Sequence, residues 1–527
     1  MISRTNRAAR PWIIGAATLL SALGAAQAAD ETPRKGGTVI ITLGTDPPTV
    51  NPITTSGVPD HIIGCMTSQG LTKETYTGDV IPELAKSWTV SPDGRTYTFE
   101  LREAKWHDGK PFVAEDVKFT METAAKFSPT FATVGKLLDT VEAPEPHKVV
   151  IKLKEPFGPF LISLACPLGS AIIPKHIFEG TNILQNPSAI GTGPYKLVEW
   201  QHGSHLKLVR NPDYWEPGKP YLDEVIAKII PQGPARTQAL IAGEVDFISY
   251  YYFPNADYKT VKDNPKLKIV QSATPPSNDY MFLNTTRKPL DDKRVRQALM
   301  IALDRDFLVR NAWQGNGQPG QMPFTSQIPW AANPDVDYRK MYPYDPAKAN
   351  AMLDEIGLKR GADGTRFKLT MVVAPDDVEY GPVSAAIKAM WAGVGVTLNI
   401  ESNERATALK RVYVDKDFDI AINGYGTYNE PALGLSRAFT TSGIGRLYGN
   451  GSAYSNLKVD ELFEKGASAT DRAERGGYYK EAQAILADEL PVITLREKGL
   501  LDVVNKNVND YLDEAHATSW RKAWLSQ

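Results

Sequence analysis

Strand-like segments, separated by loops and one helical stretch, make up the first half of the chain. Residues 37–46 (GTVIITLGTD) alternate between apolar and polar positions as a β-strand does, and a proline-rich loop follows them. A helical pattern then surrounds Cys65. Further strand patterns, bounded by turn residues, are RTYTFEL (95–101), HKVVIKL (147–153), YKLVEW (195–200) and HLKLVR (205–210). This order predicts an α/β fold.

Helical periodicity dominates the second half. Within residues 291–313, Val295 and Leu299 recur at the spacing of a buried helix face. Asp291 and Asp292 fall in the expected first turn, where carboxylates interact favourably with the helix dipole. The segment is therefore predicted to be helical.

The order of elements also predicts where the chain changes domain. Two strand patterns enclose a helical pattern between residues 367 and 402, so 285–490 is predicted to form a βαβ-type domain. The final apolar run, at 490–504, resembles the strands of the first half. We therefore expect the chain to leave the first lobe near Thr274 and to return near Val492, so that two segments form a hinge.

The first 28 residues are predicted to be a cleaved secretory signal peptide. Three arginines precede an apolar run at 12–25, which ends in the small-residue triplet Ala26-Gln27-Ala28. An uncleaved membrane anchor is the alternative, but the run is shorter than the roughly 20 residues that cross a bilayer. No cysteine lies at the cleavage site, so a lipid anchor is not expected.

Charge and length limit the possible partners. The chain has 527 residues and a formal net charge of −2, and cleavage of the arginine-containing leader makes it more acidic. It has no basic patch and no second long apolar run, so neither nucleic acid nor membrane insertion is expected. The length predicts two or three domains of roughly 150 residues.

The two cysteines permit one disulfide at most. Cys65 lies in a helical stretch and Cys166 in an apolar one (FLISLACPLG). Buried free thiols are the favoured interpretation, and a disulfide between them is the alternative.

The segment GNGQPG at 315–320 matches the dinucleotide fingerprint G-x-G-x-x-G. That fingerprint requires a strand before it and a helix that begins at its end. Here a helical pattern precedes the segment, and Pro319 and Pro323 prevent a helix from beginning. A surface or cleft loop is predicted instead.

Catalytic motifs are not recognisable in the sequence. His107 lies next to Asp108, but there is no G-x-S-x-G and no H-E-x-x-H, and none of the seven histidines is paired at metal-binding spacing. His107 is therefore predicted to be structural. No catalytic residue, metal site or cofactor is predicted.

Three consecutive tyrosines follow the strand pattern GEVDFIS. In a strand, Tyr250 and Tyr252 would share one face and Tyr251 would occupy the other. Three adjacent tyrosines do not all fit in a core, so at least one should reach a cleft or solvent. Tyr251 is our candidate for a ligand-binding residue.

Several segments, in order, resemble one protein family. They are GGTVIITLGTDPPTVNP, DVIPELAKSWTVSPDGRTYTFELREAKWHDGKPFVAEDVKF, GTGPYKLVEW, LVRNPDYW, FLNTTRKPLDDKRVRQALMIALDRD, YDPAKANAMLDEIGL and GYGTYNEP. Together they resemble the extracytoplasmic solute-binding proteins of the oligopeptide and dipeptide type (bacterial extracellular solute-binding family 5). These proteins serve ATP-binding cassette (ABC) importers.

The resemblance implies an α/β, two-lobe, periplasmic-binding-protein-like (type II) fold with an extra subdomain in the first lobe. Lobe I is expected at 29–275 and 493–527, with the extra subdomain at about 61–185, and lobe II at 276–492. The implied function is that of a periplasmic receptor without catalytic activity. It would deliver a small-molecule or peptide ligand to an inner-membrane ABC permease, and we expect it to be a monomer.

The ligand stays open at this point. A di- or oligopeptide is the family default, and an opine, a sugar conjugate or another non-peptide solute is the alternative. Rival functions are a secreted hydrolase, which lacks a recognisable nucleophile and base, and a periplasmic chaperone or sensor.

The resemblance also implies candidate ligand-binding residues. In relatives, the loop that corresponds to GYGTYNEP contacts the ligand, and an aspartate in it pairs with the ammonium group of a bound peptide. Thr427 occupies that position here, so the salt bridge is absent. Asp279 or Glu430 is the candidate replacement, although Glu430 and Asn429 are equally expected to hold the loop in shape. The candidates that the resemblance implies are Thr55, Ser56, Gly57 and Val58 in the first-lobe loop, Asn278 and Tyr280 at the crossover, and Tyr425, Gly426, Thr427, Tyr428, Asn429 and Glu430 in the GYGTYNEP loop. Tyr251 joins them from the tyrosine pattern described above.

Overall fold

A computed structural model describes residues 32–55, 57–75, 78–128, 130–272, 275–374, 379–512 and 519–526. The predicted signal peptide lies outside these residues. From Arg34 onward the chain forms one compact unit. None of the helices in the described ranges has both the length and the apolar character that a membrane span needs.

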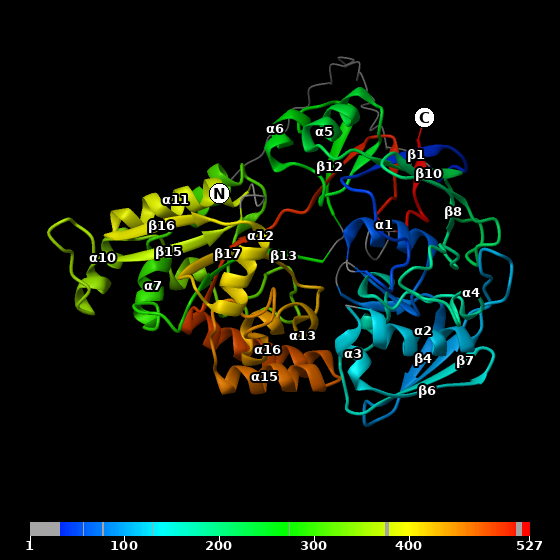
Figure 1. The fold of residues 1–527 in the computed structure, drawn as a ribbon, viewed down its shortest axis with the longest axis horizontal. Helices are drawn as coiled ribbons and strands as arrows, with labels where there is room; N and C mark the ends of the chain where they lie inside the picture. The colour runs from blue at the N-terminus through cyan, green and yellow to red at the C-terminus, as the bar shows by residue number, and fades with distance from the viewer. Residues whose placement is uncertain are drawn as a thin grey trace, which may run out of the picture. The chain divides into compact units, whose positions relative to one another are not determined.

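Seven strands of the described chain form one large sheet (Figure 1). β1 (Thr38–Leu43) pairs in parallel with its neighbours β10 and β11, and the remaining pairs are antiparallel. Buried Val39, Ile41 and Leu43 of β1 belong to the core of this sheet. The strands predicted at 195–200 and 205–210 are confirmed. In sheet order the strands are β12 (Leu267–Gln271), β19 (Leu501–Asn505), β11 (Phe247–Ile248), β1, β10 (Glu224–Ile229), β9 (His205–Arg210) and β8 (Tyr195–Gln201).

A four-stranded antiparallel sheet with its own core is inserted within this part of the chain. β5 (Thr96–Leu101) and β7 (Lys148–Leu153) alternate strictly between buried and half-buried side chains, as the sequence pattern predicts. The outer strands are β4 (Ala85–Val90) and β6 (Leu138–Glu145), and α2 (Ala114–Phe127) packs on β6 and β7. This sheet and α2 form a separate hydrophobic cluster, which supports the proposal of an extra subdomain.

Six strands form the third sheet. β15 (Phe367–Val373), α11 (Tyr380–Gly393) and β16 (Val396–Ser402) form the predicted βαβ unit, with β15 and β16 parallel. Helix α7 (Lys293–Ile301) begins after Asp292, whose side chain accepts a hydrogen bond from the Arg294 N–H. Two further helices, α15 (Leu457–Ser468) and α16 (Arg472–Glu489), pack against each other. In sheet order the strands are β14 (Gln318–Pro319), β18 (Val492–Glu497), β13 (Ser277–Leu283), β17 (Ile420–Gly426), β15 and β16.

The chain passes between the two large sheets twice. It goes from β12 to β13 between Gln271 and Ser277, and from β18 to β19 between Glu497 and Leu501. The predicted return near Val492 is therefore too early, because β18 pairs with β13 and β14 of the six-stranded sheet. The apolar run at 490–504 contains two strands, and hydrophobicity alone does not assign each strand to a sheet. The exact lobe limits stay a proposal.

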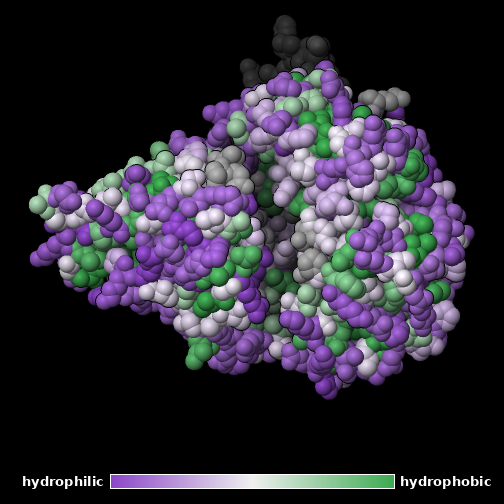
Figure 2. Space-filling model, viewed as in Figure 1, coloured by the Kyte–Doolittle hydropathy of each residue, from purple (hydrophilic) through white to green (hydrophobic). Residues whose placement is uncertain are grey.

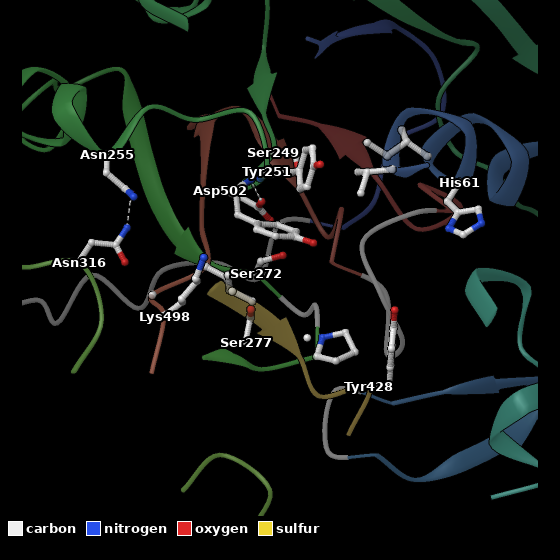
Figure 3. A pocket seen from close by; sticks show the side chains of 18 of the residues that line it. His61, Ser249, Tyr251, Asn255, Ser272, Ser277, Asn316, Tyr428, Lys498 and Asp502 are labelled. Atoms are coloured by element: carbon white, nitrogen blue, oxygen red, sulfur yellow. Dashed lines mark hydrogen bonds between the residues drawn. The ribbon is translucent and has the colours of Figure 1, made fainter. Parts of the chain in front are cut away.

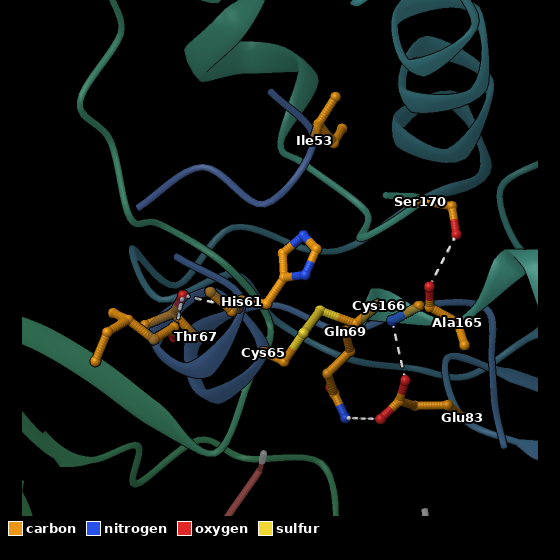
Figure 4. The surroundings of a disulfide bond; sticks show 12 residues. Ile53, His61, Cys65, Thr67, Gln69, Glu83, Ala165, Cys166 and Ser170 are labelled. Carbon is orange, nitrogen blue, oxygen red and sulfur yellow. Dashed lines mark hydrogen bonds between the residues drawn. A yellow bond between two sulfur atoms is a disulfide. The ribbon is translucent and has the colours of Figure 1, made fainter. Parts of the chain in front are cut away.

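Cys65 and Cys166 form a disulfide, with their Cα atoms 5.9 Å apart (Figure 4). The bond joins α1 (Val58–Thr67) to the segment that follows the four-stranded sheet. The expectation of free thiols is therefore wrong. Both sulfurs are buried beside Ala171, so the apolar surroundings indicated burial correctly. Those local surroundings could not show that Cys65 and Cys166, which lie 101 positions apart in the sequence, are close in the folded protein.

Candidate functional site

A cavity of about 550 Å³ is lined by elements of both large sheets. Figure 2 shows the surface hollowed at the centre of this view, where Figure 1 places α1 opposite β13 and β17. Both segments that connect the sheets contribute to the lining, with Ser272, Pro275 and Ser277 from one and Lys498 to Leu500 from the other. The cavity therefore lies beside the two segments that connect the sheets, in the region where the sequence predicted a hinge.

Aromatic side chains form part of the cavity wall. Tyr250 and Tyr251 lie in a turn after β11, and the Tyr251 side chain is 57% exposed. Tyr252, in contrast, is buried in the core. The three tyrosines therefore lie in a turn and not in the strand that we predicted. Tyr251 nevertheless reaches the cavity, as expected (Figure 3).

Four of the predicted ligand-binding residues line the cavity. Val58 begins α1, Gly426 ends β17, and Tyr251 and Tyr428 extend from turns. Tyr428 and the next residue, Asn429, both have left-handed backbone conformations, with φ of 54° and 53°. This tight turn directs Tyr428 toward the cavity (Figure 3) while Asn429 is buried.

Asn278, Tyr280 and Tyr425 lie in the core and not at the cavity. The Asn278 amide donates a hydrogen bond to the Tyr280 hydroxyl at 3.0 Å, and the Tyr425 hydroxyl donates to the Gly449 carbonyl at 2.7 Å. All three side chains are essentially inaccessible. Strand alternation explains the placement, because Asn278 and Tyr280 share one face of β13 whereas Ser277, on the other face, lines the cavity.

Thr427 and Glu430 shape the loop after β17. The Thr427 hydroxyl donates to the Pro276 carbonyl at 2.8 Å, and the residue is fully buried. Glu430 caps the short helix α13 (Pro431–Gly434) and forms a buried ion pair with Arg475 at 2.5 Å. Glu430 therefore has its own counter-charge and is not the replacement for an amine-binding acid.

The first-lobe loop is held by its own hydrogen bonds. The Thr55 hydroxyl donates to Asp60 at 3.2 Å and accepts from the Gly57 N–H at 2.9 Å. Neither Thr55 nor Gly57 is among the residues that line the cavity, although the next residue, Val58, is. Ser56 lies outside the described residues.

A buried ionic cluster lies behind the cavity wall. Asp279 pairs with Arg496 at 2.6 Å and with Lys498 at 3.0 Å, and it accepts a hydrogen bond from Tyr380 at 2.8 Å. Burial alone would raise the pKa of Asp279, but Arg496 and Lys498 lower it overall. Arg496 also pairs with Glu379 at 2.8 Å. Asp279 is thus fully engaged and does not replace the missing acid either.

Asp502, which was not among the residues predicted from the sequence, has its carboxyl group on the cavity wall. It is 1% exposed and accepts a hydrogen bond from the Tyr250 N–H at 2.8 Å. Burial raises the pKa of Asp502 to about 7. The sequence did contain a signal for this residue, because Asp502 is an acid within the apolar run LLDVV. Buried strands seldom contain an unpaired carboxylate, so an acid at such a position indicates a functional role.

Two motifs weighed as catalytic or nucleotide-binding are structural. His107 accepts from the Gly191 N–H through Nδ1 at 3.2 Å, and its Nε2 lies 3.0 Å from the Gly193 carbonyl oxygen. Burial lowers the pKa of His107 to about 4. The loop at 315–320 borders the cavity through Asn316, and a Cβ on Gly317 would lie 2.3 Å from the Glu497 carbonyl oxygen. This loop is therefore a cleft loop.

Comparisons with known proteins agree with this architecture. Residues 79–446 match the model of the bacterial extracellular solute-binding proteins, family 5. The chain is 30% identical to the glutathione-binding protein GsiB of Pectobacterium atrosepticum (84% of this chain, 87% of the relative). It is 29% identical to the dipeptide-binding protein of Escherichia coli K12 (83% and 84%).

The solved structures include the oligopeptide-binding protein AppA of Bacillus subtilis in complex with a nonapeptide. It is 27% identical, with a TM-score of 0.74 over 94% of this chain and 100% of AppA. The two large sheets and the two connecting segments thus form the two-lobe, type II fold of these proteins. The chain belongs to the bacterial extracellular solute-binding proteins of family 5.

Proposed function

We propose that this protein is a monomeric periplasmic receptor that captures a small solute and presents it to an ABC permease in the inner membrane. The observation that carries the proposal is the cavity at the hinge, lined by both sheets and by both connecting segments. A ligand there contacts both lobes at once. It therefore favours the closed arrangement by the difference between its affinities for the closed and the open form.

The ligand that we favour is a short peptide or a peptide-like solute. The volume of about 550 Å³ falls within the range of pockets that enclose small ligands. Tyr250, Tyr251, Tyr428 and Trp520 supply aromatic surface, and Ser249, Ser272 and Ser277 supply hydroxyl groups. Relatives named for dipeptide and glutathione binding support the same class. An opine or another non-peptide solute of similar size is the second candidate, because Thr427 replaces the amine-pairing acid.

We propose binding without catalysis. His107 is held by backbone groups and is not among the residues that line the cavity. The lining does include His61 and Asp502, but each is held by a nearby polar group, with the His61 Nε2 3.2 Å from the Thr55 carbonyl oxygen and Asp502 accepting from the Tyr250 N–H. Micromolar capture corresponds to about −8 kcal/mol, which a few hydrogen bonds and aromatic contacts in a closing cleft can provide.

Mass spectrometry of the small molecules released when protein from its native periplasm is denatured tests this function. We expect one compound in near-stoichiometric amount, unchanged after prolonged incubation with fresh protein. Parallel incubation with panels of peptides and esters distinguishes the rivals: turnover would support a hydrolase, and heat of binding without turnover supports the receptor. A protein that releases no small molecule and binds no member of the panels would contradict the proposal.

A further inference from the structure

Asp502 is a buried acid with no ion-pair partner among the described residues. Its side chain lies at the start of β19, on the cavity wall close to Ser249 and Tyr251 (Figure 3). Its partners are the Tyr250 N–H at 2.8 Å, the Tyr511 hydroxyl at 3.5 Å and the Ser272 hydroxyl. These neutral donors orient the carboxyl group but supply no positive charge. A cationic group that enters the cavity would supply it.

Lys498 provides the opposite charge on the same connecting segment. Its ammonium group lies 3.0 Å from Asp279, but Asp279 also binds Arg496, and the Lys498 side chain is 24% exposed. The backbone fixes its position, because the Lys498 N–H donates to the Ser277 carbonyl at 2.8 Å. Gly424 leaves room for it, since a Cβ there would lie 3.0 Å from the Lys498 Nζ. Lys498 can therefore bind an anionic group in the cavity.

We propose that segment 498–502 recognises a zwitterionic ligand, with Lys498 binding a carboxylate and Asp502 binding an ammonium group. The proposal rests on the receptor function above and specifies its ligand as a peptide with free termini. Charge-assisted hydrogen bonds of this kind are roughly twice as strong as neutral ones. In this proposal Asp502, on β19, binds the ammonium group. Thr427, at the position where relatives have the amine-binding acid, instead donates a hydrogen bond to the Pro276 carbonyl.

The spacing of the two charges favours a short ligand. Four residues of fully extended chain span at most about 14 Å, and the lysine side chain can shorten the separation of the charged groups. The termini of a di- or tripeptide lie within this upper limit, whereas the termini of a long extended peptide would lie farther apart. This agrees with a cavity of about 550 Å³.

The test uses the tightest binder from a pooled library of di- and tripeptides, prepared with free termini, N-acetylated and C-amidated. Calorimetry on the wild-type protein should show at least tenfold weaker binding for each blocked form. In the Asp502→Asn variant, the N-acetylated peptide should bind as tightly as the free peptide. In the Lys498→Gln variant, the C-amidated peptide should bind as tightly as the free peptide. Asp263→Asn and Lys340→Gln are matched controls on exposed charges and should change neither penalty.

Two outcomes overturn the proposal. One is a wild-type protein that binds the blocked and free forms equally, a result that does not depend on any variant. The other is an Asp502→Asn protein, folded by circular dichroism, that keeps its preference for the free amine. If no library peptide binds, the compound released from native protein is treated with acetic anhydride and with acidic methanol. If the compound lacks an amine or a carboxyl group, the proposal of a zwitterionic ligand is wrong, but the receptor function still holds. If the protein releases no compound, both proposals are wrong.

Discussion

The carboxyl group of Asp502 gives the ligand-free protein a pH dependence of its own. Burial raises its pKa to about 7, well above the value near 4 in an unfolded chain. The folded state therefore binds the proton more tightly than the unfolded state. Its contribution to stability is complete below about pH 4 and is lost as the pH rises through 7. The groups that face it are the Tyr250 N–H and the hydroxyls of Ser272 and Tyr511.

We predict that Asp502→Asn removes this dependence, because an amide does not titrate in this range. Between pH 5 and pH 8, the wild-type protein should lose about 2 to 3 kcal/mol of unfolding free energy relative to the variant. Urea denaturation of both ligand-free proteins at the two pH values measures the difference, and other titrating groups cancel in the comparison. A constant difference between the two proteins would show that Asp502 titrates normally.

Thr427 was expected to contact the ligand, but its buried position gives it a structural role. Its hydroxyl donates to the Pro276 carbonyl in a fully buried position. Thr427→Asp removes the donor and places a carboxylate next to that carbonyl oxygen, so we predict a loss of about 3 kcal/mol or more in unfolding free energy. Thr427→Ser keeps the hydroxyl and should stay within about 1 kcal/mol of the wild type. Chemical denaturation measures both variants, and a Thr427→Asp protein as stable as the wild type would place this side chain at the cavity.

At the scale of residues, the sequence located the right segments more reliably than the right side chains. The loop GYGTYNEP does border the cavity, yet only Gly426 and Tyr428 of its six candidates line it. Which residue of a turn faces a cavity depends on backbone angles such as the left-handed pair at Tyr428 and Asn429. The local sequence does not determine those angles on its own.

At the scale of elements, the disulfide fixes α1, which contributes Val58 and His61 to the cavity. It closes a long loop, because Cys65 and Cys166 lie 101 positions apart. We predict that Cys65→Ala combined with Cys166→Ala lowers the unfolding free energy by about 2 to 5 kcal/mol. Denaturation in urea without reductant measures the loss. Thiol titration of the unfolded, unreduced protein should detect no free thiol, and two thiols at that stage would contradict the bond.

The elements themselves were predictable where the local pattern was strong. β5, β7 and β9 follow their alternating patterns closely, because one face of each strand is buried. β8 forms where it was predicted, but a register shift between Leu197 and Glu199 interrupts its alternation. β18 was assigned to the wrong sheet, since a strand with every residue buried shows no alternation that identifies its neighbours. Pairing between distant strands is a tertiary property.

At the scale of the whole molecule, two connecting segments join the sheets, and the proposed ligand site lies between them. We predict that a saturating ligand decreases the radius of gyration in small-angle X-ray scattering, while the far-UV circular dichroism stays the same. Closure by rotation about the two segments leaves the sheets intact, which is why only the first signal should change. A scattering curve that ligand leaves unaltered would argue against domain closure.

The two-lobe architecture was predictable because the family resemblance covers most of the chain and the order of strands and helices agrees with it. The positions where the sheets exchange strands were less predictable. The first crossing was expected at 274 and lies between Gln271 and Ser277, whereas the second was expected at 492 and lies after Glu497. Only the second boundary was placed too early, by a few residues, because β18 pairs within the six-stranded sheet.

Blocking the cavity between the two connecting segments shows whether a solute binds there without reaction. Gly426 lines it, and an added Cβ would meet no atom within 4 Å, so Gly426→Trp should fill the space without disturbing the fold. Gly477→Trp, at an exposed position of α16 with equally open space, is the matched control. Calorimetric titration with the compound released from native protein should give one site per chain in the wild type and in Gly477→Trp, and no detectable binding in Gly426→Trp. Equal binding by all three folded proteins would show that the solute does not bind in this cavity.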